Sequence, residues 1–174
     1  MRIVSIVGTR PQFMKAAVIS RALMNYNRKN VSNPILETLI HTGQHYDDKM
    51  SKIVFDELGL SKHYEYLDVG SGSHAQQTAQ NMSRFEPVLL QSRPDWVMVV
   101  GDVNSTLACA LVCAKINVPV AHVEAGLRSY DRSMPEEINR MVTDSITDYF
   151  FTTSETANKN LKNCLNHFQN FTQK

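Results

Sequence analysis

Three carboxylate side chains stand where a parallel sheet would place an active site. Asp102 follows the apolar stretch WVMVV and a glycine, and Glu124 directly follows the stretch PVAHV. Glu136 comes just after Pro135, in what should be the first turn of a helix. Carboxylates gathered in one pocket, beside a cation that holds the substrate, suit removal and return of a proton at carbon. We therefore take Asp102, Glu124 and Glu136 as candidate acid/base residues.

Each of these carboxylates also has a purely structural interpretation. Asp102 would be an ordinary N-cap of the helix that follows it. Glu124 would form an ion pair with Arg128, four residues further on. Glu136 and Arg140 are also four apart and share a helix face, and an exposed pair of this kind contributes only about 0.3–0.5 kcal/mol. Residue type and spacing leave both interpretations open.

Basic and polar side chains follow the first two apolar stretches. Arg10 and Lys15 lie beside an expected helix start, where positive charge and exposed backbone N–H groups favour an anion; a turn with two solvated basic residues is the alternative. Gln44 and His45 follow the second stretch, and His45 would either contact a ligand or lie free in its loop. His122 is expected to pack in the core. Without a GxGxxG or GxxxxGK[ST] pattern, neither a standard dinucleotide fingerprint nor a P-loop is expected.

Alternating strands and helices must position these residues. Short apolar runs predict strands at Arg2–Val7, Leu36–Thr42, Tyr64–Asp68, Trp96–Val100, Pro119–Val123 and Tyr149–Thr152. Helical patterns between them predict helices at Gln12–Asn25, Asp47–Leu58, Ala75–Gln91, Asn104–Ile116, Pro135–Ile146 and Glu155–Leu165, with Asn104 or Ser105 as the cap of the fourth. This order predicts an α/β fold with a doubly wound parallel sheet, whose ligands bind at the carboxyl ends of the strands.

Composition narrows the class of protein. The chain has 174 residues, of which 43% are hydrophobic, and a net charge of +1. No global positive field draws such a chain to nucleic acid, and no apolar run reaches the roughly 18 residues of a membrane helix. The start lacks a signal peptide, and the odd cysteine count fits reduced thiols, so we expect a cytoplasmic protein. Cys109 and Cys113 are expected in the core, and no metal site is expected.

Five segments in order and spacing together resemble the non-hydrolysing UDP-N-acetylglucosamine 2-epimerases. They are GTRPQFMK (Gly8–Lys15), HTGQHYDD (His41–Asp48), GDVNST (Gly101–Thr106), HVEAGLRS (His122–Ser129) and MPEEINR (Met134–Arg140). The resemblance runs from Arg2 to about Leu161 and implies the N-terminal Rossmann-like domain of a GT-B-like, two-domain fold. It divides the chain into that domain, residues 1–161, and a polar tail, residues 162–174. The family's C-terminal UDP-binding domain would then be absent.

The resemblance also implies an activity and roles for the candidate residues. The family inverts C2 of UDP-GlcNAc to give UDP-ManNAc, by eliminating UDP and adding it back, with no cofactor and no metal. It implies acid/base roles for Asp102, Glu124 and Glu136, and substrate-binding roles for Arg10, Lys15, Gln44, His45 and Arg140. The expected partners are a UDP-sugar, a second copy of the chain and a separate C-terminal domain, with neither nucleic acid nor membrane. The setting it suggests is polysaccharide biosynthesis.

Other functions fit the same residues. The motif forms GTRPQ and TGQHYDD are similar to the branch that acts on UDP-2,3-diacetamido sugar acids, so the sugar stays open. A non-catalytic lobe that binds nucleotide-sugars or supports assembly is a second class of function. A GT-B glycosyltransferase shares the fold, but GTRP together with HVEAGLR disfavours it. With half of the cleft missing, we expect the isolated chain to be weak or inactive as an epimerase.

Overall fold

The fold is built on one parallel sheet that holds six strands among the described residues. The computed structural model describes residues 1–43 and 64–169 of the chain. The strands are β1 (Arg2–Val7), β2 (Leu36–His41), β3 (Tyr64–Tyr66), β4 (Trp96–Val100), β5 (Val120–Val123) and β6 (Tyr149–Phe151). Their order in the sheet is β3-β2-β1-β4-β5-β6, and every pair is parallel. The predicted doubly wound α/β fold is confirmed.

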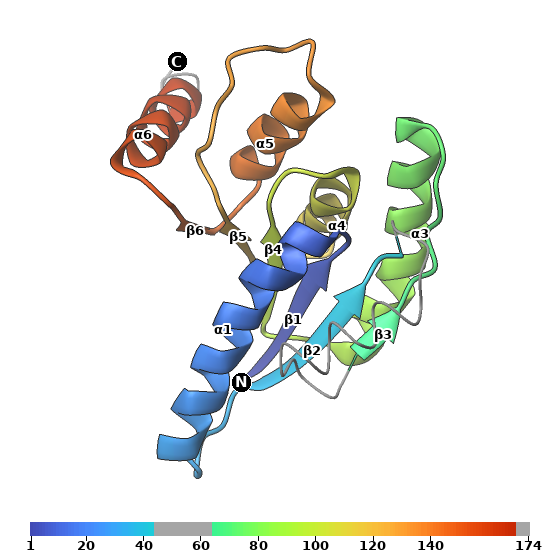
Figure 1. Ribbon diagram of the computed structural model, residues 1–174, viewed down its shortest axis with the longest axis vertical. Coiled ribbons are helices and arrows are strands. Elements are labelled where there is room, and N and C mark those ends of the chain that lie inside the picture. The colour runs from blue at the N-terminus through green and yellow to red at the C-terminus, as the bar shows by residue number, and fades with distance from the viewer. Residues whose placement is uncertain (44–63, 170–174) are drawn as a thin grey trace.

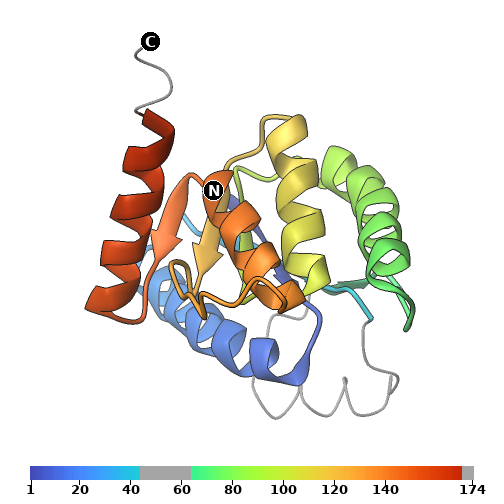
Figure 2. The same ribbon diagram turned by 90° about the horizontal axis from the view of Figure 1, so that it is seen from above.

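Helices cover both faces of this sheet. They are α1 (Arg10–Lys29), α3 (His74–Ser92), α4 (Asn104–Lys115), α5 (Pro135–Ser145) and α6 (Glu155–Gln169). Figures 1 and 2 show α1 on one face, α3 and α4 side by side on the other, and α6 beyond β6 at the edge of the sheet. Helix α5 packs on α4. None of the helices in the described part of the chain is long and apolar enough to span a bilayer.

The main core lies between the sheet and the α3–α4 pair. Strand β4 is apolar throughout and β1 is apolar at four of its six positions, because helices cover both faces of these central strands. Phe85 and Leu89 of α3 fill this core together with Cys109 and Cys113 of α4, so the prediction of core cysteines is confirmed. Burial raises the pKa of the Cys113 thiol to about 12.

Several element boundaries differ from those predicted. Helix α1 begins at Arg10, because Thr9 is its N-cap, and α6 continues past Leu165 to Gln169. The predicted caps of α4 are wrong: Val103 occupies the N-cap, and Asn104 is already helical. The amide of Asn104 instead bonds to side chains of α3 and α5. The predicted helix at residues 47–58 lies outside the described residues.

The strand order determines which loops meet. Strands β1, β4 and β5 are neighbours, and parallel strands all end at the same edge. That edge therefore brings together Gly8 after β1, Gly101 after β4 and Glu124 after β5. The sheet thus gathers most of the residues that the sequence singled out.

Candidate active site

The loop after β1 is held in place by Gln12, a residue that sequence reasoning missed. Its Oε1 accepts hydrogen bonds from the backbone N–H groups of Gly8 (2.6 Å) and Thr9 (3.0 Å). Its Nε2 donates to the carbonyl of Val100 at the end of β4. Exposed backbone N–H groups were expected beside this helix start, but those of Gly8 and Thr9 are occupied by Gln12. Positive charge at this loop comes from the side chains of Arg10 and Lys15.

Lys15 and Glu124 form an ion pair at this edge of the sheet. Nζ of Lys15 donates to Oε2 of Glu124, and the two side chains are 38% and 21% exposed. The predicted alternative for Glu124, a pair with Arg128, is wrong. Glu124 has a φ of +70°, a left-handed conformation that costs a non-glycine residue about 1–2 kcal/mol. Strained backbone of this kind clusters at functional sites, which agrees with a role for this carboxylate.

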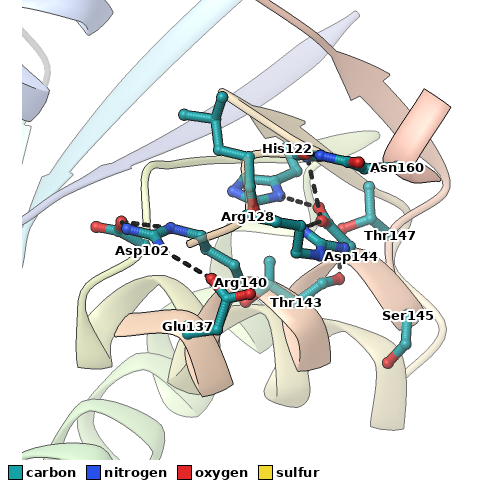
Figure 3. A network of polar contacts seen from close by, with 12 residues as sticks. Asp102, His122, Arg128, Glu137, Arg140, Thr143, Asp144, Ser145, Thr147 and Asn160 are labelled. Carbon is teal, nitrogen blue, oxygen red and sulfur yellow. Dashed lines mark hydrogen bonds and ion pairs between the residues drawn. The ribbon is translucent and has the colours of Figure 1, made fainter. Parts of the chain in front are cut away.

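Arg140 holds the second candidate carboxylate. Its Nε and Nη2 lie 2.8 Å and 2.6 Å from Oδ2 of Asp102, and its Nη1 donates to Glu137 at 2.9 Å (Figure 3). Two predictions fail here: Val103, and not Asp102, is the N-cap of α4, and Arg140 pairs with Glu137 where a pair with Glu136 was expected. The guanidinium thus joins one half-exposed carboxylate to one buried carboxylate.

Glu137, which sequence reasoning also missed, is the buried anchor of this chain of contacts. It is 1% exposed and accepts from the N–H (2.9 Å) and Oγ (3.1 Å) of Ser129 and from the N–H of Tyr130 (3.2 Å). Burial by itself would raise the pKa of Glu137, but these bonds and the one from Arg140 outweigh it and lower that pKa. Burial would likewise lower the pKa of Arg140, but its bonds to Glu137 and Asp102 raise it. The site therefore holds Glu137 ionised at neutral pH.

His122 is buried, as predicted, but it belongs to a polar cluster. Its Nδ1 lies 2.8 Å from Oδ1 of Asp144, and its Nε2 lies 2.7 Å from the carbonyl oxygen of Gly101. Oδ2 of Asp144 accepts from Arg128 Nη1 (2.6 Å) and from the N–H of Gly126 (3.1 Å). Figure 3 shows this second network beside the one around Arg140. No sequence signal marked Asp144.

The other candidate residues are placed differently. Glu136 lies in the first turn of α5, half-buried, and no hydrogen bond or ion pair reaches its carboxylate from the described residues. Arg10 is exposed and has no such contact within that same part of the chain. No contact joins Asp102, Glu124 and Glu136 directly there, so the three share an edge and not a hydrogen-bond network. Gln44 and His45 lie outside the described residues.

The side chains offer charge and proton chemistry at this edge. Among residues 1–43 and 64–169, no group of three or more His, Cys, Asp and Glu side chains could hold a metal ion. Two candidate carboxylates at this edge, Asp102 and Glu124, are paired with cations, and Glu136 has no such partner among the described residues. The cationic candidates there are Arg10, Lys15 and Arg140. Fold and site together define an α/β protein with a doubly wound parallel sheet, whose ionisable groups are collected at the carboxyl edge where such sheets bind ligands.

Comparison with known proteins gives the family. The family model described as UDP-N-acetylglucosamine 2-epimerase matches residues 28–170, and the chain belongs to this family. A UDP-N-acetylglucosamine 2-epimerase homolog of Methanococcus maripaludis is 52% identical over 94% of this chain and 43% of its own length. A UDP-2,3-diacetamido-2,3-dideoxy-D-glucuronate 2-epimerase of Pseudomonas aeruginosa is 46% identical over 94% of this chain and 44% of its own.

A solved structure agrees with this assignment. The UDP-GlcNAc 2-epimerase of Methanocaldococcus jannaschii, in complex with UDP-GlcNAc and UDP, superimposes with a TM-score of 0.85 and 47% identity. The match covers 94% of this chain and 43% of that one. The chain therefore spans less than half the length of the relatives it matches. The recognised family and the Rossmann-like, GT-B-like fold are confirmed.

Proposed function

We propose that this chain supplies the N-terminal half of a UDP-N-acetylglucosamine 2-epimerase site, which interconverts UDP-GlcNAc and UDP-ManNAc. The observation that carries the proposal is the pairing of site carboxylates with cations at one sheet edge, Lys15 with Glu124 and Arg140 with Asp102. The 47% identity to a structure solved with UDP-GlcNAc supports this substrate.

The reaction that the family resemblance implies asks for two kinds of group. A base takes the C2 proton while the C1–O bond to UDP breaks, the electron pair leaves with UDP, and a C1=C2 double bond forms. UDP then adds back to C1, and C2 receives a proton on its opposite face. Carboxylates exchange the proton, and cations hold the diphosphate and its developing charge.

The candidate residues divide between these tasks. Arg10 and Lys15, at the start of α1, bind the diphosphate or sugar. The family resemblance gives Gln44 and His45, outside the described residues, a role in binding the nucleotide-sugar. Asp102, Glu124 and Glu136 serve as the acid/base carboxylates, and Arg140 stabilises negative charge beside them. The chain spans less than half the length of its relatives, so these 174 residues would form only part of the cleft. The chain alone is then weak or inactive.

A related sugar acid is the second candidate substrate. The Pseudomonas aeruginosa relative is named for UDP-2,3-diacetamido-2,3-dideoxy-D-glucuronate. Its substrate carries an extra carboxylate, which needs a cation. Arg10 is exposed and makes no ion pair with any described residue, so its guanidinium is free to bind either the diphosphate or that carboxylate.

Proton NMR in D2O tests the proposal. The 174-residue chain is incubated with UDP-GlcNAc, alone and mixed with the separately expressed C-terminal half of the Methanococcus maripaludis homolog. We expect deuterium at C2 and the ManNAc epimer in the mixture, little of either with the chain alone, and loss of both with Glu136→Gln. The sugar acid is run in parallel. A folded mixture that binds both nucleotide-sugars and exchanges neither would refute the epimerase assignment.

A further inference from the structure

The buried cluster of His122, Arg128 and Asp144 lies beside the contacts of Arg140 with Asp102 and Glu137 (Figure 3). Its side chains are between 1% and 7% exposed, and its two ion pairs measure 2.8 Å and 2.6 Å. Charges so fully removed from water are costly unless they are paired and hydrogen-bonded. The sequence reasoning expected His122 only to fill space, and the proposed function uses none of the three.

Both ring nitrogens of His122 face oxygen acceptors. Nε2 lies 2.7 Å from the carbonyl oxygen of Gly101, which cannot donate. Nδ1 lies 2.8 Å from Oδ1 of Asp144, whose other oxygen is paired with the guanidinium of Arg128. A carboxylate beside a guanidinium is ionised and likewise only accepts. Both contacts can be hydrogen bonds at the same time only if each ring nitrogen carries a hydrogen atom. That form of the ring is the imidazolium.

The cluster holds the backbone of both loops that carry the carboxylates. Gly101, held through its carbonyl by His122, immediately precedes Asp102 and has a φ of +68°. Gly126, held through its N–H by Asp144, follows Glu124 by two residues and has a φ of +80°. These two left-handed turns are thus hydrogen-bonded to two residues of the same buried cluster, His122 and Asp144.

The net charge of the cluster also favours the binding of an anion at the site. Arg128 and the imidazolium of His122 bring two positive charges against the single negative charge of Asp144. Because the cluster contacts both loops, through the carbonyl of Gly101 and the N–H of Gly126, this positive charge favours a bound anion at the same edge.

We propose that His122 is a positioning residue for the proton chemistry at this edge of the sheet. As an imidazolium it fixes the peptide before Asp102 and, through Asp144, the turn after Glu124. It touches no reacting atom. The inference rests on the proposed function only in taking those two carboxylates as the reacting groups; the imidazolium and its two anchors are properties of this chain alone.

A matched pair of variants separates positioning from simple core packing. His122→Gln places an amide N–H near the position of Nε2 and keeps the bond to Gly101, whereas His122→Asn places it near Nδ1 and keeps the bond to Asp144. Both variants lose the ring and the charge. Circular dichroism and thermal melting show that each is folded before it is compared.

NMR of the ¹⁵N-labelled 174-residue chain decides the inference without any substrate. We expect hydrogen on both ring nitrogens of His122 while its contacts to Asp144 and Gly101 are in place. We also expect the amide signal of Asp102 to stay in place in His122→Gln and to move in His122→Asn. A bare ring nitrogen, or equal displacement of that amide in both variants, would overturn the proposal.

Turnover in the two-part mixture then measures the consequence for catalysis. We expect His122→Asn to lower kcat about 100-fold with little change in KM, because a small misplacement of a reacting group costs that much. His122→Gln should recover most of this loss. Equal kcat in the two variants would overturn the positioning role. An inactive wild-type mixture that keeps the NMR pattern would refute the epimerase assignment and leave the anchoring of Asp102 standing.

Discussion

Replacing Glu137 by glutamine should destabilise the chain far more than the same change at its neighbour Glu136. Glu137 is 1% exposed and accepts four hydrogen bonds, from two groups of Ser129, from Tyr130 and from Arg140. Glutamine keeps one accepting oxygen and turns the other into a donor. If the oxygen keeps the three bonds made by Oε2, the new NH₂ group faces the N–H of Tyr130.

The size of the effect follows from these contacts. The hydrogen bond from the N–H of Tyr130 is part-buried, and leaving this N–H without an acceptor and facing the new NH₂ group costs about 1–3 kcal/mol. Replacing the charge-assisted bond to Arg140 by a neutral one removes about 1 kcal/mol more. We therefore expect Glu137→Gln to lower the free energy of unfolding by about 2–4 kcal/mol. Glu136→Gln, with no described partner for its carboxylate, should stay within about 0.5 kcal/mol.

Urea unfolding at pH 7 measures both values, and an unchanged m-value shows that the comparison is sound. The pH dependence gives an independent check. The pKa of Glu137 is lower in the folded chain than in the unfolded chain, where it is about 4.3. Its stabilisation is therefore complete above that value and is lost as the pH falls through the folded pKa. The difference between Glu137→Gln and wild type should shrink over the same range. Equal stability of the two glutamine variants at pH 7 would show that the Glu137 contacts do not stabilise the fold.

Three further predictions concern other parts of the chain. Lys15→Met should change the free energy of unfolding by less than about 1 kcal/mol, because its ion pair is half-exposed, yet weaken UDP binding in NMR titrations; unchanged binding would remove it from the site. Gly126→Ala should lower the melting temperature more than Gly101→Ala, because its Cβ would lie 2.5 Å from a backbone oxygen whereas that of Gly101 meets only ordinary contacts; equal losses would contradict this packing. In the native chain at pH 8, a thiol reagent should label Cys164 and spare the two buried thiols of α4, whose pKa values are raised by burial; labelling of all three before unfolding would contradict this.

The sequence predicted the fold well because its signals are local. Strand and helix order follow from apolar runs separated by Gly, Pro and Asn, and that order already implies the parallel sheet. The start of α1 and the N-cap of α4 were predicted wrongly, because capping residues determine where each helix begins. Thr9 and Gln12 carry the T-x-x-Q spacing of a capping box, which would have shown that α1 starts at Arg10. Val103 caps α4 without a side-chain bond, so no sequence pattern marks that start.

The partners of the charged residues could not be predicted in the same way. Spacing of four suggested that Arg140 pairs with Glu136 and Arg128 with Glu124, but tertiary structure sets both pairs differently. In α5, Glu137 is buried and pairs with Arg140, which lies three residues further along the helix. Arg128 reaches Asp144, sixteen residues away, because the loop after β5 folds back over α5. Such pairings depend on the strand order and on the direction of each helix face, which no local pattern contains.

The two ion pairs of the site differ in how firmly each carboxylate is held. Lys15 has a long, flexible side chain, is 38% exposed and bonds to no described group other than Glu124. Arg140 is 16% exposed and is fixed on its other side by Glu137. An incoming diphosphate can therefore draw Lys15 away at little cost, whereas Arg140 cannot turn without breaking its bond to a buried carboxylate. On the proposed function, substrate binding would release Glu124 and leave Asp102 in place. Glu124 is then the better placed of the two to exchange a proton during the reaction, and Asp102 the better placed to act at a fixed position.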